Sequence, residues 1–353
     1  MGIPLEETYF SGICARSAWD VEVYDNKLFV GSGDYDQNLG PVSMCFYDFS
    51  TGSWELEDIL NDEQIGRFYI FDNVLYAPGL DPRVSWETGN YYSYKSGGDG
   101  WETHTVLPNG VHNFDLIKFN GKLFAGLGVE EGSSPVVMSE DGENWVSTPL
   151  YKDGALRETY NATFIRVYDF FVLNDTLYAY FSLSGTDVKS AWEIYRFDGE
   201  KFVYHSDLPT SGLSWNKHTY VHFYDKVEFK GCQYFSTGNL YKTTDMVTAE
   251  LMDMGENTEV TGLRIIGKEL YALCSTPVES EDGRTTFHIS VRKSRDGKTF
   301  NEVFYFDYDV RAMSFTYSNG TFYLGMGFGT TKTGELYDKN GMVLSVEYAT
   351  GER

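Results

Sequence analysis

The sequence predicts an all-β fold, a seven-bladed β-propeller built from four-stranded antiparallel blades. The composition favours strands and turns, since 27 Tyr and 25 Phe accompany 36 Gly in 353 residues. One hairpin pattern recurs seven times along the chain. No helical period competes with it, because apolar residues alternate or run in groups of five and six.

The first element of each repeat is a tight hairpin turn. Asn, Asp and Gly dominate these turns because they tolerate the positive φ that such turns require. Their spacing averages roughly 50 residues, which is typical of propeller blades. The seven turns are Asp25-Asn26, Asp72-Asn73, Asn120-Gly121, Asn174-Asp175, Lys230-Gly231, Gly267-Lys268 and Asn319-Gly320.

The second element is a short strand that follows each turn and has an aromatic residue at its second position. The copies begin at Leu28, Leu75, Leu123, Leu177, Gln233, Leu270 and Phe322. Another hairpin follows, as in Ser139 to Trp145 (SEDGENW) and Ser294 to Phe300 (SRDGKTF), while the copy at Thr243 to Asp245 is degenerate. Four strands joined by hairpins make one blade, and stacking blades in a closed ring buries both faces of each sheet.

The repeats predict one domain that covers residues 1–353. The last copy ends where its fourth strand should begin, so the run Leu5 to Phe10 is expected to pair with the strand around Val343 to Tyr348 and to close the ring. The predicted blades span residues 16–60, 64–108, 111–151, 164–209, 220–255, 259–307 and 311–351, the last one completed by 5–10.

Two of the turns carry a resemblance. The segments SEDGENW and SRDGKTF resemble Asp boxes, the turn motif of sialidase-like propellers, although each is one residue shorter than the usual form. The repeated strand, as in Leu123-Phe-Ala-Gly126, resembles kelch-like and other sugar-directed propellers. This resemblance implies the propeller architecture over the whole chain, whereas Asp boxes are structural turns far from any active site. The arginine motif that opens the first blade of sialidases has no counterpart here.

The charge balance restricts the partners. A formal net charge of −24 argues against nucleic acid, because phosphates are bound by clustered Lys and Arg. No apolar run is long enough to span a bilayer, so no membrane insertion is expected, and the charge favours a soluble monomer. The N-terminus lacks the basic and apolar parts of a signal peptide. Two alternatives stay open: a cytoplasmic chain, or an extracellular or cell-surface chain whose signal has been removed.

The repeat register predicts a polar ring near the axis. Counting back eight residues from each second strand reaches the start of the innermost strand, here termed the axial position. It holds Asp20, Arg67, Asp115, Asp169, Asp225, Gly262 and Ser314. Three residues earlier, the upstream position holds Ser17, Gln64, His112, Arg166, His222, Glu259 and Arg311. Charges so close to the axis must be paired, solvated or bound to a ligand. The alternative interpretation is structural, with each Asp bonded to backbone N–H groups of the adjacent blade.

Aromatic side chains are expected beside this ring. Trp19, Tyr168 and Tyr224 lie within it, and Trp86 and Trp215 lie in neighbouring loops. Flat aromatic faces suit the apolar C–H groups of sugar rings. Ordinary packing between blades is the alternative.

These residues predict a carbohydrate-directed propeller that binds or cleaves a glycan at the channel mouth, as a glycoside hydrolase or a polysaccharide lyase. The ligand is expected to be a carbohydrate or another small polar molecule. Hydrolysis needs two carboxylates that flank the bond, and elimination from a uronic acid needs a His or Tyr base with an Arg or a metal that neutralises the substrate carboxylate. The alternative is a non-catalytic protein-interaction or ligand-binding propeller that uses loops 80–90, 128–134, 183–191 and 276–286. Candidate catalytic residues are His112, His222, Asp115, Asp225 and Glu259, and candidate ligand-binding residues are Asp20, Arg67, Arg166, Asp169, Arg311 and the five aromatics named above.

Neither reaction requires a cofactor. Asp and His would suit Ca²⁺ or Mn²⁺ at the channel mouth, but no metal-ligand spacing supports such an ion. The four cysteines are interpreted as buried free thiols, with a Cys14–Cys45 disulfide as the alternative.

Overall fold

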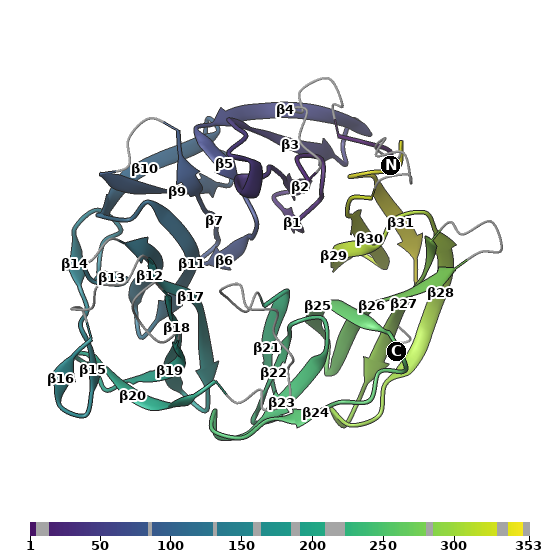
Figure 1. The fold of residues 1–353 in the computed structure, drawn as a ribbon. Helices are drawn as coiled ribbons and strands as arrows, with labels where there is room; N and C mark the ends of the chain where they lie inside the picture. The colour runs from purple at the N-terminus through teal and green to yellow at the C-terminus, as the bar shows by residue number, and fades with distance from the viewer. Residues whose placement is uncertain are drawn as a thin grey trace.

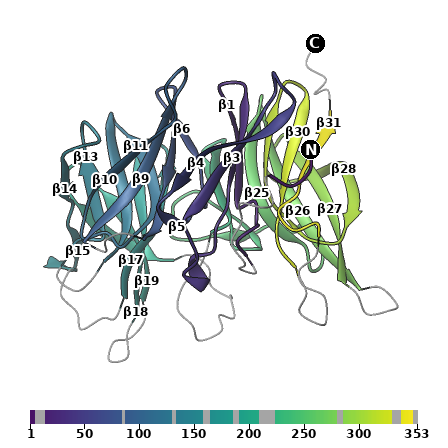
Figure 2. The same cartoon turned by 90° about the horizontal axis from the view of Figure 1, so that it is seen from above.

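The fold is all-β in the computed structural model, which describes residues 1–4, 14–83, 87–129, 133–157, 164–184, 191–208, 223–279, 285–329 and 338–348. Within these ranges, the one helical segment is a 3₁₀ turn at Tyr35–Gln37. The sheets stand around a common centre (Figure 1), and a second view shows them from the side of the ring (Figure 2). The predicted β-propeller fold is therefore confirmed. None of these residues belongs to a helix long and apolar enough to cross a membrane.

Five separate blades of three or four strands are present in the described residues. The first contains β1 (Asp20–Tyr24), β2 (Lys27–Gly31), β3 (Val42–Asp48) and β4 (Ser53–Leu60). The second contains β6 (Tyr69–Phe71), β7 (Val74–Pro78), β9 (Thr88–Lys95) and β10 (Trp101–Pro108). The third contains β21 (Asp225–Phe229), β22 (Cys232–Ser236), β23 (Leu240–Thr243) and β24 (Glu250–Leu251). The fourth contains β25 (Glu259–Ile266), β26 (Glu269–Glu279), β27 (Thr285–Ser294) and β28 (Asn301–Tyr308). The last has three strands, β29 (Ala312–Ser318), β30 (Thr321–Met326) and β31 (Val343–Glu347).

The prediction of seven blades is wrong, because the remaining strands form one continuous 12-stranded sheet. The end of β12 pairs with β17 at Gly128↔Arg166 and Val129↔Ile165, so no gap separates the third and fourth repeats. At the other side, β8 pairs with β11 at Leu80↔His112. Strands that extend beyond the predicted blades thus form hydrogen bonds with strands of the neighbouring repeat. This sheet contains β5 (Asp62–Gln64), β8 (Leu80–Pro82), β11 (His112–Phe119), β12 (Lys122–Val129), β13 (Val136–Ser139), β14 (Trp145–Ser147), β15 (Leu150–Lys152), β16 (Ala155–Leu156), β17 (Phe164–Leu173), β18 (Thr176–Ser184), β19 (Ala191–Phe197) and β20 (Phe202–Asp207).

The first and last blades lie side by side (Figure 1). Ala18 N donates to Met326 O at 3.0 Å, and Ser314 Oγ donates to Ala18 O at 2.9 Å. Gly2 forms an antiparallel bridge with Val343. The run Leu5 to Phe10 lies outside the described residues, so its pairing with the last blade stays a prediction.

In six of the seven hairpin turns of the repeat both residues have the expected positive φ, and in the turn Gly267-Lys268 only the glycine does. Asn120 and Gly121 have φ of 49° and 79°, and Asn174 and Asp175 have φ of 49° and 57°. Positive φ is costly for most side chains, which explains why Asn, Asp and Gly recur there.

Three of the second hairpins share one turn, including the copy expected to be degenerate. In SEDGENW, Ser139 Oγ accepts from Gly142 N at 2.9 Å, and Asp141 Oδ1 accepts from Glu143 N at 2.9 Å and from Asn144 N at 2.8 Å. These N–H groups favour the charged carboxylate and hold the pKa of Asp141 well below its usual range. The same three bonds recur at Ser294 and Asp296, and at Thr243 and Asp245.

Aromatic side chains fill the spaces between neighbouring repeats. Phe29 on β2 meets Trp101 on β10 edge-on, with ring centroids 5.7 Å apart. Phe124 on β12 meets Phe202 on β20 in the same way at 6.2 Å. This packing fixes the innermost strands, and their starting residues face the centre of the ring.

Candidate functional site at the channel mouth

A cavity of about 290 Å³ lies where the innermost strands begin, here termed the mouth cavity. Seven of the 18 described residues that line it are aromatic, and five are charged: Asp34, Asp36, Arg67, Asp169 and Arg311. The aromatic side chains of the wall are Trp19, Tyr35, Phe114, Tyr168, Phe223, Tyr224 and Phe328.

The repeat places aromatic side chains in this wall through the residue directly before the axial position. Trp19, Phe114, Tyr168 and Tyr224 all occupy it. In β11 the pairing register shifts between Asn113 and Asp115, so Phe114 is the extra residue of a β-bulge. Tyr168 is the corresponding residue in β17. A bulge re-aims a side chain away from the regular alternation of the strand, which explains how a strand that packs on both faces still projects an aromatic ring into the cavity.

A second, more polar cavity of about 210 Å³ adjoins the first and is termed the axial chamber. Trp19, Arg67 and Tyr224 contribute to the walls of both cavities. Asp20, Glu22, Asp225, Lys226 and Arg264 line the chamber alone. The charged residues of the axial ring therefore divide between two spaces.

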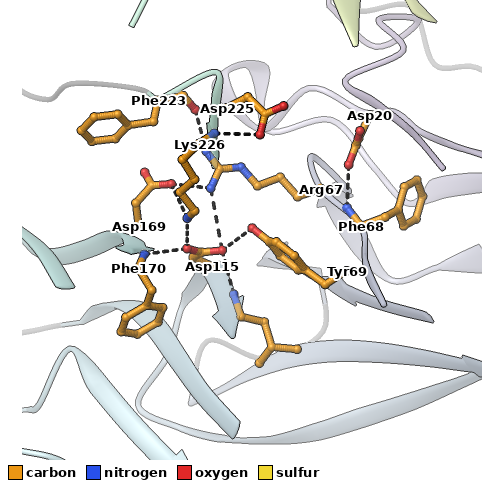
Figure 3. Close-up of polar contacts among 11 residues, drawn as sticks. Asp20, Arg67, Phe68, Tyr69, Asp115, Asp169, Phe170, Phe223, Asp225 and Lys226 are labelled. Carbon is orange, nitrogen blue, oxygen red and sulfur yellow. Dashed lines mark hydrogen bonds and ion pairs between the residues drawn. The ribbon is translucent and has the colours of Figure 1, made fainter. Parts of the chain in front are cut away.

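One charge cluster surrounds Arg67 (Figure 3). Arg67 Nη1 pairs with Asp169 and lies 3.7 Å from Asp115 Oδ1, while Nη2 donates to Phe223 O at 2.6 Å. Lys226 Nζ pairs with both buried carboxylates and lies 2.8 Å from Asp169 Oδ1. Two cations thus balance two carboxylates. Burial by itself would lower the pKa of Arg67, but Asp169 and other neighbours outweigh it and raise that pKa.

A second charge cluster surrounds Arg264. Its Nη1 lies 2.7 Å from Asp225 Oδ2, and its Nη2 lies 3.2 Å from Asp20 Oδ1 and 3.9 Å from Glu22 Oε2. One cation here serves three carboxylates. Burial raises the pKa of Asp20 to about 7 and raises the pKa of Glu22 as well, against the opposing effect of Arg264.

Three of the four axial aspartates also bond to the next innermost strand. Asp20 Oδ2 accepts from Phe68 N at 2.8 Å, Asp115 Oδ2 from Phe170 N at 2.7 Å, and Asp225 Oδ2 from Leu263 N at 2.7 Å. This is the arrangement that the structural interpretation of the ring expects. A carboxylate that holds a backbone N–H and a buried cation is committed to the fold, so these aspartates are poorly placed to act on a ligand.

Arg311 differs from these clusters. Its Nη1 lies 3.2 Å from Glu259 Oε2 and 3.5 Å from the Tyr224 hydroxyl. Its guanidinium lies over the rings of Tyr224 and Phe328, with centroid distances of 5.8 and 5.6 Å. Glu259 does not line the mouth cavity, but it contacts Arg311, which does.

His112 and Arg166 are brought together but do not line either cavity. His112 Nδ1 lies 2.7 Å from Asp81 Oδ1, and its Nε2 lies 3.4 Å from Arg166 Nη2. Arg166 Nη1 donates to the Tyr168 hydroxyl at 2.9 Å. Both side chains pack against aromatic residues of the cavity wall. Three other predicted site residues, His222, Trp86 and Trp215, lie outside the described residues.

Among the described residues, no three His, Cys, Asp or Glu side chains converge as metal ligands, so the Ca²⁺ or Mn²⁺ hypothesis gains no support there. All four cysteines are free thiols, and the Cys14–Cys45 disulfide does not form. Burial raises the pKa of the Cys14 thiol, which lines the mouth cavity, to about 12. That thiol is therefore a poor nucleophile at neutral pH.

Sequence reasoning missed four charged or polar residues of the two clusters. Glu22, Tyr69 and Arg264 stand two residues after an axial position, and Lys226 stands one residue after it. Alternate residues of a strand share a face, so a period of two from Asp20, Arg67 and Gly262 would have found the first three. Lys226 is polar where the other repeats have Val21, Phe68, Leu116, Phe170, Leu263 and Phe315.

No known protein-family model matches the sequence, and no curated protein matches it. Solved structures resemble the fold. A streptogramin B lyase shares 8% identity with a TM-score of 0.56, covering 98% of this chain and 97% of that one. Virginiamycin B lyase from Staphylococcus aureus shares 9% identity with a TM-score of 0.56, covering 92% and 94%. A chain of a mitotic checkpoint complex shares 10% identity with a TM-score of 0.51, covering 90% and 92%. These likenesses support the β-propeller fold and lend the chain no residue or activity.

Proposed function

We propose that this protein binds a small carbohydrate in the mouth cavity. The observation that carries the proposal is the composition of the cavity wall, in which flat aromatic side chains surround a space of about 290 Å³ and a few charged groups interrupt them. This volume is near the lower end of ligand cavities and suits a ligand of one or two sugar rings. Aromatic faces stack on the apolar side of a sugar, and polar groups bond its hydroxyls.

The geometry favours binding over hydrolysis. All four axial aspartates, Asp20, Asp115, Asp169 and Asp225, pair with Arg67, Lys226 or Arg264. An acid and a base that flank a glycosidic bond must be able to exchange protons with it, and paired buried carboxylates are not poised for that exchange. The proposal therefore does not include catalysis.

The protein-interaction alternative draws no support from the described residues. Each of the loops 80–90, 128–134, 183–191 and 276–286 includes residues outside them. The Asp-box and kelch-like likeness agrees with a sugar-directed propeller, and the shared turn of the second hairpins is consistent with it, but the proposal does not depend on that likeness.

Calorimetric titration with a panel of methyl glycosides and disaccharides tests the proposal. We expect at least one sugar to bind, and we expect Trp19→Ala to weaken that binding at least tenfold, because the variant removes a stacking face. Tyr305→Ala is the matched control, since Tyr305 is an exposed aromatic residue on β28 that does not line the cavity. If Trp19→Ala fails to fold, Phe328→Ala removes the neighbouring face. Absence of binding by the whole panel, or equal loss in the Tyr305→Ala control, would overturn the proposal.

A further inference from the structure

Arg311 has an unused hydrogen-bonding edge at the mouth cavity. Its side chain lines the cavity and is 21% exposed. Among the residues that the structure describes, Nη1 alone has hydrogen-bond partners, Glu259 and Tyr224. Among the described residues, Nε and Nη2 of Arg311 have no acceptor. The guanidinium plane is held by the rings of Tyr224 and Phe328, so the free edge is fixed in direction.

The other arginines at the axis have no such edge to offer. Arg67 uses Nη1 on Asp169 and Nη2 on Phe223 O. Arg264 uses Nη1 on Asp225 and Nη2 on Asp20. Both of these arginines are engaged by both Nη atoms, whereas Arg311, which lines the cavity, keeps two adjacent donors without an acceptor among the described residues. Two parallel N–H groups match the two oxygens of a carboxylate.

We infer that the sugar bound in the mouth cavity carries a carboxylate, as in a uronic acid, and that the Nε–Nη2 edge of Arg311 receives it. This inference rests on the proposed function. The Glu259 side chain is 43% exposed, so its single contact with Arg311 is a solvated ion pair and competes weakly with a bidentate ligand.

The rest of the cavity favours a singly charged ligand that also donates hydrogen bonds. Asp34 and Asp36 line the same cavity, and Asp34 already accepts from Cys14 N and Gln37 N. Asp36 is exposed, and its carboxylate bonds to the Tyr35 side chain and has further lone pairs that can accept from a sugar hydroxyl. A phosphate would carry a charge near −2 at neutral pH and would meet Asp34, Asp36 and Glu259, so it is a poorer match than a carboxylate.

Calorimetric titration with matched methyl glycosides tests the assignment. The pairs are methyl glucuronoside against methyl glucoside, and methyl galacturonoside against methyl galactoside. We expect a uronate to bind at least tenfold more tightly than its neutral partner. In Arg311→Gln this ratio should fall to about one, and Arg311→Lys should recover part of it. Arg295→Gln is the matched control, because Arg295 is 85% exposed, lies on the outer turn of another hairpin and contacts only Glu269 by a charged pair; it should keep the wild-type ratio.

The outcomes separate this inference from the proposed function. If neutral and acidic sugars bind equally to the wild type, or if the preference survives Arg311→Gln, the inference fails and sugar binding stands. If neither kind of sugar binds, both fail. If a sulfated or phosphorylated methyl galactoside binds as tightly as the uronate, the assignment of a carboxylate is overturned.

Discussion

Arg264 and Arg311 stand on neighbouring blades and line adjoining cavities, but their surroundings are opposite. Arg264 contacts three carboxylates in the axial chamber, and Arg311 contacts one exposed carboxylate at the mouth cavity. The first arrangement engages both Nη groups of the side chain within the fold. The second leaves Nε and Nη2 without an acceptor among the described residues, on a side chain that lines an aromatic-rich cavity. The comparison separates a cation that stabilises the ring from a cation that is available to a ligand, although both come from the same kind of repeat.

The largest expected effect is the loss of unfolding free energy when Arg264, the cation of the axial chamber, is replaced. Arg264→Met would leave Asp20, Glu22 and Asp225 close together without their shared partner. Removing one member of a buried charge cluster costs about 3 kcal/mol of unfolding free energy, because the remaining charges are left uncompensated. Urea denaturation of the variant and the wild type at neutral pH measures this loss.

Arg295→Met provides the control for that loss. Arg295 also pairs with a glutamate, Glu269 at 2.6 Å, but its side chain is almost fully exposed. An exposed pair contributes about 0–1 kcal/mol. A loss of less than about 1 kcal/mol in Arg264→Met, equal to this control, would mean that the chamber is solvated and that the contrast between the two arginines is not real.

The sequence predicts where the axial aspartates lie better than it predicts their role. Counting along the repeat located Asp20, Asp115, Asp169 and Asp225 near the centre, since hairpin register fixes which residues begin the innermost strands. It could not assign their role, because the deciding bonds join Asp20 to Phe68 N and Asp225 to Leu263 N, across sheets that the sequence does not align in space. The hydrogen bonds between strands of different repeats could not be predicted for the same reason. The pairing of β12 with β17 that overturns the blade count depends on how far two strands overhang their turns, which no local pattern encodes.

The repeat register anticipates only part of the mouth-cavity wall, for a related reason. It places Trp19, Tyr168 and Tyr224 beside the polar ring, and all three line the mouth cavity. The same pattern suggested His112 and Arg166, which pack outside it. A β-bulge directs Phe114 into the cavity and leaves His112 beside Asp81, and a bulge cannot be read from residue spacing alone.

Asp62, a buried carboxylate that contacts no cation in the described residues, is the opposite case to the paired carboxylates of the axial chamber. Asp62 is fully buried and accepts from the Tyr92 hydroxyl and from Asn90 Nδ2 at 2.8 Å, and none of its contacts in the described residues is a cation. Burial raises the pKa of Asp62 to about 6. The folded state therefore binds a proton more tightly than the unfolded state, so the contribution of Asp62 to stability is full below about pH 4 and declines as the pH rises through about 6.

Asp62→Asn should remove this decline. We expect the unfolding free energy of the wild type to fall between pH 4 and pH 7 by on the order of 2 kcal/mol more than that of the variant. Urea denaturation at each pH gives both curves, and their difference cancels the general effect of the acidic surface. Parallel curves for the two proteins would show that Asp62 has the same proton affinity in the folded and unfolded states.

Replacing Arg311 at the mouth cavity should change the unfolding free energy much less than replacing Arg264 in the axial chamber. In Arg311→Met the partner left behind is Glu259, which is already in contact with solvent, and the apolar stem can keep its packing against Phe328. We expect a change in unfolding free energy of less than about 1 kcal/mol. A loss as large as that of Arg264→Met in the same urea experiment would place Arg311 among the structural cations and would remove the basis for treating it as a ligand contact.

The smallest effect concerns the acidic side of the mouth cavity. Asp36→Asn removes an exposed negative charge but keeps an oxygen that can accept from a sugar hydroxyl. Two unit charges separated by about 10 Å in a water-like dielectric repel by about 0.4 kcal/mol, so a bound uronate should gain about twofold in affinity, and its neutral partner should gain nothing. Calorimetric titration at low ionic strength measures the difference. Because exposed charges are screened within about 3 Å at 1 M salt, the gain should vanish there. An equal change in affinity for both sugars, or a gain that persists at high salt, would mean that the charge of Asp36 does not repel the carboxylate of the bound sugar.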